Sequence, residues 1–162
     1  MILGMSVSTF TLVHVLLSLV GIFTGLVVVC GFLNGRLLNG WNGLFLLTTI
    51  LTSATGFLFH SAQFGPPHVV GVISLVLLGF SVAALYAFNL AGPWRWIYAA
   101  TATLALYLNV FVGVVQAFQK VSFLQPLAPT QSEPPFAIAQ GLVLVIFLAL
   151  TFLASRRLRA FR

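Results

Sequence analysis

Three histidines are the side chains of this sequence best suited to chemistry: His14, His60 and His68. A neutral imidazole is a common metal ligand and the usual axial ligand of haem iron. A b-type haem needs two histidines at matched depth on facing helices, and His14 with His68, or His14 with His60, would meet that need. We therefore predict a haem b site held by one of these pairs, in an electron-transfer setting. Neither HExxH nor CxxCH spacing accompanies the histidines.

Copper or zinc is a second interpretation of the same residues. All three imidazoles and the carboxylate of Glu133 would supply three nitrogens and one oxygen, a set that suits either ion. This site requires the segment 119–135 to fold back over the helices. In a third interpretation the histidines do no chemistry: His60 and His68 are interfacial residues at helix ends, and His14 is a hydrogen-bonded residue of the interior. The sequence leaves all three interpretations open.

A second polar group lies further along the chain. Asn109 and Gln116 fall on one face of the segment 94–118, and Gln140 lies near the start of the last apolar run. Buried amides must find hydrogen-bond partners in hydrocarbon. They could therefore line a pocket for a quinone head group, whose carbonyls accept hydrogen bonds, or join one helix to another. A channel or small-solute carrier along this face is a further alternative, although it lacks charged gating residues.

The elements that must position these side chains are membrane helices. Of 162 residues, 60% are hydrophobic and 5% are charged, and the mean hydropathy is +1.14, whereas about 25% of the residues in a soluble domain are charged. The apolar residues form runs of about twenty, the length needed to cross about 30 Å of hydrocarbon. We predict an all-α integral membrane helical bundle that forms a single domain over residues 1–162. Its five transmembrane helices are expected at 10–33, 41–60, 68–90, 94–118 and 136–154, with one outer loop at 119–135.

Aromatic residues mark one end of this bundle. The break at 92–93 is so short that the third and fourth spans should form an antiparallel hairpin. The starts of the second and fourth spans then lie near the same membrane surface. Four aromatic residues at these starts fit an interfacial belt: Trp41, Trp94, Trp96 and Tyr98.

The basic residues predict the orientation of the bundle. Lys and Arg are retained preferentially on the cytoplasmic side. With the arginine-rich C-terminal tail in the cytoplasm and an odd number of spans, Arg36 and Arg95 also lie inside, so that only Lys120 is external. The N-terminus and the three histidines are then on the outer side. The formal charge of +6 is therefore read as a topology anchor that meets the lipid bilayer and its anionic head groups, and no nucleic-acid partner is expected.

Several classes of activity are disfavoured. No Asp or Glu lies in a predicted span, so the carboxylate relay of many proton-coupled pumps is missing. There is also no glycine-rich phosphate loop and no Ser-His-Asp set. Cys30 is the single cysteine and cannot form an intrachain disulfide. We assign no catalytic residue and do not expect self-contained hydrolysis or ATP-driven transport.

Three segments carry a resemblance to known sequences. Residues 94–98 (WRWIY), 107–112 (YLNVFV) and 127–136 (LAPTQSEPPF) resemble stretches of a family of small polytopic bacterial inner-membrane proteins that has no assigned function. The resemblance covers most of the chain. It implies a bacterial cytoplasmic membrane, and it brings no activity, cofactor or site residue.

The expected role is that of a small integral inner-membrane subunit or accessory protein. Its outer-side histidines would hold haem b or a metal for electron transfer. The alternative is a non-catalytic structural or assembly subunit that packs against other membrane subunits or against itself through stripes of Gly, Ser and Thr. A small-solute or quinone-binding membrane protein is the third candidate.

Overall fold

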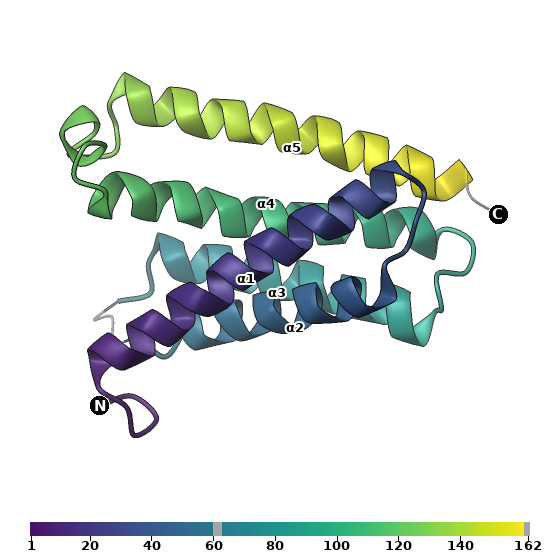
Figure 1. Cartoon of the computed structure of the whole chain (residues 1–162), viewed down its shortest axis with the longest axis horizontal. Helices are drawn as coiled ribbons and strands as arrows, with labels where there is room; N and C mark the ends of the chain where they lie inside the picture. Colours follow the sequence, from purple (N-terminus) through teal and green to yellow (C-terminus); the bar gives the residue numbers. More distant parts are fainter. Residues whose placement is uncertain (60–62, 161–162) are drawn as a thin grey trace.

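The computed structural model describes residues 1–59 and 63–160 and is helical throughout, as predicted (Figure 1). An isolated bridge between Ile2 and Met5 is the sole β-type pairing in these ranges. The π-helix η1 continues α3 directly, and the 3-10 turn η2 interrupts the connection between α4 and α5. The elements are α1 (Val7–Leu33), α2 (Asn39–Gly56), α3 (Pro66–Val82), η1 (Ala83–Ala87), α4 (Trp94–Lys120), η2 (Gln125–Leu127) and α5 (Pro134–Ala160).

Helix α4 is the centre of the bundle because it contacts each of the other four helices. Consecutive helices are antiparallel neighbours, α5 lies along α4, and α1 runs obliquely across α4 to meet the end of α5 (Figure 1). The core is built around α4 from side chains of all five helices, among them Phe32, Phe45, Leu78, Leu106 and Phe147.

Within residues 1–59 and 63–160, four helices are long and apolar enough to cross a membrane: α1, α3 extended by η1, α4 and α5. The remaining helix, α2, corresponds to the span predicted at 41–60, but it has 18 residues and ends at Gly56. Three polar side chains of this helix face the inside of the bundle: Asn42, Thr48 and Thr49. All three of these side chains are buried against neighbouring helices. The bundle that was predicted is present, and its second helix is polar on the inside.

The end of α1 is fixed by its own backbone. Gly35 adopts a positive φ of 66°, which a residue with a Cβ adopts only at a cost. The Arg36 amide then donates to the Gly31 carbonyl at 2.8 Å, and the Gly35 amide donates to the Phe32 carbonyl at 2.9 Å. This pair of bonds is the Schellman arrangement, which satisfies carbonyls that the end of a helix would otherwise leave without partners. It turns the chain sharply toward α2.

Of the aromatic residues predicted to form a belt, those at the turn between η1 and α4 differ in exposure. Trp96 is exposed, and the Trp94 ring stacks on Phe88 with centroids 3.9 Å apart and planes at 2°. Tyr98, by contrast, is fully buried in the core, where its hydroxyl donates to the Asn42 side-chain oxygen at 2.7 Å. Its expected interfacial position is therefore wrong: the spacing of 94–98 along a helix turns Trp96 outward and Tyr98 inward.

Close packing of α1 on its neighbours depends on Gly25. A Cβ at this position would lie 2.6 Å from Leu106 Cδ1 and 2.8 Å from the Phe45 ring, well inside van der Waals contact. The glycine thus lets α1 approach α2 and α4 together. Small residues serve this purpose in membrane helices, where lipid tails are as apolar as the protein and packing must supply the association.

We predict that Gly25→Ala destabilises the bundle by about 1–3 kcal/mol, the usual cost of overpacking a core. The free energy of unfolding should be measured by titration in mixed detergent micelles. Gly79→Ala is the matched control because Gly79 is also helical and a Cβ there meets nothing within 4 Å. The control should be neutral or slightly stabilising, since alanine favours helix. Equal effects of the two substitutions would contradict the packing argument.

Candidate functional site

His14 lies where α1 meets the end of α2. Its Nδ1 is 2.8 Å from the Thr55 hydroxyl, and its ring meets Phe59 edge-on with centroids 5.1 Å apart. A Cβ on Gly56 would lie 3.8 Å from His14 Cε1, so the ring rests over the backbone of α2. The imidazole is half-buried and contacts Thr55 and Gly56 of α2 and Phe59, which follows that helix.

The hydrogen-bond count around Thr55 assigns the tautomer of His14. The single proton of the Thr55 hydroxyl is directed at the Leu51 carbonyl at 2.6 Å, and more weakly at the Thr52 carbonyl at 3.2 Å. The hydroxyl must therefore accept from His14, whose Nδ1 donates. In a neutral ring the lone pair then belongs to Nε2. Metal-ligating histidines commonly have this form, with one nitrogen donating to a protein acceptor and the other available.

His68 sits at the beginning of α3, at the same end of the bundle. Its Nδ1 accepts from the Gly65 amide at 3.1 Å, so the side chain caps the helix that it belongs to. Its ring stacks on Phe64 and also packs against Phe57, with centroids 5.1 and 5.7 Å apart. Because Nδ1 accepts, Nε2 carries the proton in the neutral ring. The same geometry that holds His68 thus directs its Nε2 to donate.

The structure brings two of the predicted ligands, His14 and His68, to one region. His14 and His68 flank the end of α2 and the residues after it, through Phe59 and Phe57 respectively. His60 lies outside the described residues, so its part in either site stays a prediction. Across residues 1–59 and 63–160, no three His, Cys, Asp or Glu side chains gather as a set that could hold a metal ion.

Glu133, the carboxylate of the predicted metal site, is engaged in its own loop. One carboxylate oxygen accepts from the Thr130 amide at 3.2 Å and from the Thr130 hydroxyl at 2.9 Å, and the other accepts from the Ser132 amide at 3.1 Å. Its backbone carbonyl accepts from the first amides of α5. Desolvation acts to raise the pKa of the Glu133 carboxyl, but these hydrogen bonds outweigh it and hold the pKa below its usual value.

Asn109 of α4 forms a polar contact with α1. Its side-chain oxygen accepts from the Ser18 hydroxyl at 2.7 Å, and its amide nitrogen lies 3.4 Å from the Ser18 carbonyl. The two residues join α1 to α4. Gly21 lies beside them, since a Cβ there would be 3.1 Å from Asn109 Nδ2 and 3.0 Å from Thr49 Oγ1. The Thr49 hydroxyl is buried and has no hydrogen-bond partner among the described residues.

The other amides predicted on this face do not join Asn109. Gln116 is exposed on the outside of α4. Gln140 of α5 donates to the Phe111 carbonyl at 3.1 Å and so connects α5 to α4. A quinone pocket lined by these amides stays a prediction. Asn109 and Gln140 each act as a connection between two helices.

Two polar contacts escaped the sequence reasoning. Thr55, the partner of His14, lies in the last turn of α2, one residue before Gly56, and no role was predicted for it from the sequence. Asn42, the partner of Tyr98, falls just after Trp41 at the start of the span predicted at 41–60, where no role was predicted for it. Intrahelical spacing carries no information about which helix lies opposite, so only a guess at helix neighbours could have paired them.

Comparison with known proteins finds no relative of this chain. No protein-family model, no curated protein and no solved structure matches the chain. The site must therefore be interpreted from its own geometry.

We predict that Asn109→Ala lowers the free energy of unfolding by about 1 kcal/mol, the usual size of a hydrogen bond between membrane helices. Ser18→Ala should cost a similar amount, and the double variant should cost less than the sum because both single changes remove the same bond. Mixed-micelle unfolding is the measurement. Gln116→Ala is the matched control on the same helix, and a loss there as large as at Asn109 would contradict the assignment.

A pH dependence is predicted for the loop that Glu133 orders. Because its folded-state pKa is lowered, the ionised carboxylate contributes stability above the unfolded-state pKa, and this contribution is lost as the pH falls through the folded-state pKa. Hydrogen exchange of the Thr130 and Ser132 amides, corrected for intrinsic rates, should therefore show protection at neutral pH that disappears in acid. Glu133→Gln should lack the pH-dependent part. If acid does not change the hydrogen-exchange protection of these amides in the natural chain, the ionised Glu133 carboxylate does not order the loop.

Proposed function

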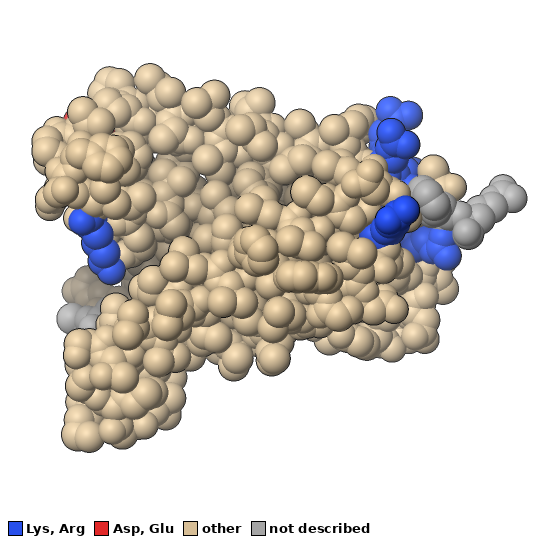
Figure 2. Space-filling model, viewed as in Figure 1, with Lys and Arg blue, Asp and Glu red and all other residues tan. Residues whose placement is uncertain are grey.

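We propose that the protein is a small multi-pass subunit of a bacterial cytoplasmic membrane whose role is structural: it packs against a partner membrane protein. All five helices cross the bilayer, with the N-terminus outside and the C-terminus in the cytoplasm. The proposal is supported by the four helices that are long and apolar enough to span and by the positions of the arginines at one end of the bundle (Figure 2). The polar inner face of α2 is compatible with a fifth crossing because neighbouring helices cover it.

The observation that carries the structural role is the pairing of interior polar groups between helices. His14 pairs with Thr55, Ser18 with Asn109, and Tyr98 with Asn42. Hydroxyl pairs join α2 to α3 and α3 to α4, through Ser53 with Ser74 at 3.0 Å and Ser81 with Thr101 at 2.8 Å. Polar groups used in this way stabilise a bundle and are not directed at a substrate.

Helix α5 is the surface on which we expect the partner. It has the smallest buried share of the four long apolar helices, and its buried side chains, Phe147, Ala154 and Leu158, lie on the side that packs against α4 and α1. Its outward face is exposed and consists of large apolar residues, including Leu142, Val145, Leu148 and Phe152. A helix attached along one side is free to receive another helix on the opposite face.

Haem b remains the second candidate because of the His14 tautomer. An imidazole that donates from Nδ1 and has its lone pair on Nε2 has the form of an iron ligand. His68 is less suited, since its Nδ1 already accepts from Gly65. The haem candidate therefore consists of His14 with His60, and the Ser, Thr and Gly residues around His14 would allow close approach of the porphyrin.

The test is affinity purification of the tagged chain from its native membranes in a mild detergent. We expect one membrane protein to co-purify at a constant molar ratio. Leu148→Trp on the outward face of α5 should reduce its recovery about tenfold, since overpacking an interface costs about 1–3 kcal/mol. Leu19→Trp on the outward face of α1 is the matched control, because both leucines are exposed at mid-helix and fluid lipid accommodates the larger ring.

The same preparations distinguish the two candidates by their absorption spectra. A stoichiometric Soret band that is lost in His14→Phe, without loss of folding, would replace the structural role with the haem role. The structural proposal would be overturned if no membrane protein co-purified at a constant molar ratio. It would also be overturned if Leu19→Trp and Leu148→Trp reduced the recovery of the partner equally.

A further inference from the structure

One end of the molecule has a strong excess of positive charge. Arg36 follows α1, Arg95 begins α4, and Arg156, Arg157 and Arg159 lie in the last turns of α5. Figure 2 shows these side chains gathered at one end, while the acidic side chain lies at the other. The described residues at the arginine end contain no Asp or Glu. An anion from outside the chain is therefore the natural counter-charge at this end.

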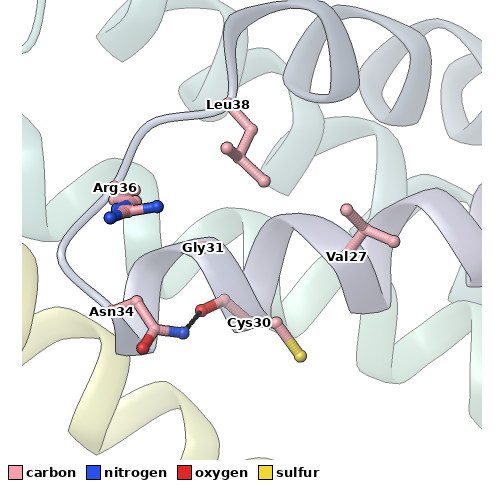
Figure 3. Close-up of a pocket in the computed structure, with 6 residues that line it drawn as sticks. All are labelled: Val27, Cys30, Gly31, Asn34, Arg36 and Leu38. Carbon is pink, nitrogen blue, oxygen red and sulfur yellow. Dashed lines mark hydrogen bonds between the residues drawn. The ribbon is translucent and has the colours of Figure 1, made fainter.

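A groove opens on the same end, between the last turns of α1 and the turn that leads to α2 (Figure 3). It has a volume of about 490 Å³, and its lining combines an apolar wall with a polar rim. The residues that line it are Val27, Cys30, Gly31, Asn34, Arg36 and Leu38.

The walls of the groove are set by the Schellman turn. The Leu38 side chain lies against Gly31, where a Cβ would be 3.1 Å from Leu38 Cδ1. The Asn34 amide turns back to donate to the Cys30 carbonyl at 2.8 Å, as the dashed line in Figure 3 marks. The Arg36 side chain is exposed on the turn, and within residues 1–59 and 63–160 its guanidinium has no hydrogen bond or ion pair.

We propose that this groove binds one anionic phospholipid of the cytoplasmic leaflet, with the lipid phosphate on Arg36 and the adjoining part of an acyl chain along Val27 and Leu38. The inference rests on the proposed crossing of the membrane and not on the partner subunit. Val27 lies about 10 Å deeper along α1 than Asn34, at 1.5 Å per residue. The groove thus runs from the head-group level toward the hydrocarbon, as a phospholipid does.

The lining favours a lipid over a free phosphate ion. A guanidinium pairs with a phosphate through two parallel hydrogen bonds, but a small ion held by one exposed arginine would be in rapid exchange with water. The apolar wall adds the favourable free energy of burying apolar surface, which only a ligand with an acyl chain can gain. Charge complementarity selects an anionic head group because every ionised side chain at this end is positive.

The experiment is native mass spectrometry of the delipidated, detergent-purified full chain, titrated with phosphatidylglycerol or with phosphatidylcholine of the same acyl chains. We expect one phosphatidylglycerol to bind in preference to phosphatidylcholine. Arg36→Gln should weaken the binding of phosphatidylglycerol about tenfold, which corresponds to the loss of one charge-assisted hydrogen bond. Arg157→Gln is the matched control, since it removes the same charge from the same end outside the groove. Val27→Trp, which fills the groove without changing the charge, should also weaken binding.

Three results would overturn the site. Equal affinity for the two lipids would show that the groove does not select an anionic head group. Equal loss of affinity in the Arg36→Gln and Arg157→Gln variants would show only a general attraction between the lipid and the positive end of the protein. Displacement of the lipid by millimolar inorganic phosphate would show that the acyl chain contributes nothing. Purified protein without any partner is used throughout, so failure here leaves the structural role untouched, and failure to find a partner leaves this site untouched.

Discussion

The structure depends on one constraint: polar groups inside an apolar bundle must find partners within the protein. Hydrocarbon offers no hydrogen bonds, so each buried hydroxyl, amide or imidazole costs free energy unless another helix supplies a donor or acceptor. Ser18 with Asn109 and Tyr98 with Asn42 meet this demand between helices that are distant in sequence. These contacts set which helices are neighbours and the depth at which they meet, because a shift along the axis would separate each pair.

Glycine makes these contacts short enough to form. Gly25 lets α1 approach Phe45 and Leu106, and Gly21 brings the same helix up to Thr49 and Asn109. A larger residue at either position would push α1 away and leave the polar atoms without partners. Close approach and polar pairing are therefore two aspects of one arrangement, in which α1 lies against both α2 and α4.

The two ends of the bundle have different chemistry. One end holds His14 and His68 against the end of α2 and the aromatic residues that follow it. The other end holds the arginines and the groove beside Arg36. The first end is stabilised by contacts inside the protein, while the second has an excess of positive charge that only its surroundings can balance. In the proposed orientation across the membrane, the arginine end would face the anionic head groups of the cytoplasmic leaflet.

Sequence alone determined the approximate positions of the helices, since apolar run length and turn residues are local properties: Gly35 and the prolines at the start of α3 mark breaks wherever the helices pack. It also identified Asn109 as a polar residue of a helix face that needs partners, because helical periodicity shows which residues share a face. Only the tertiary structure decided that Asn109 meets Ser18, that Tyr98 is buried on Asn42, and that Gln116 is exposed. Periodicity defines a face but not what lies opposite it. The neighbour of each face follows from how all five helices pack at once, and that is a property of the assembled bundle.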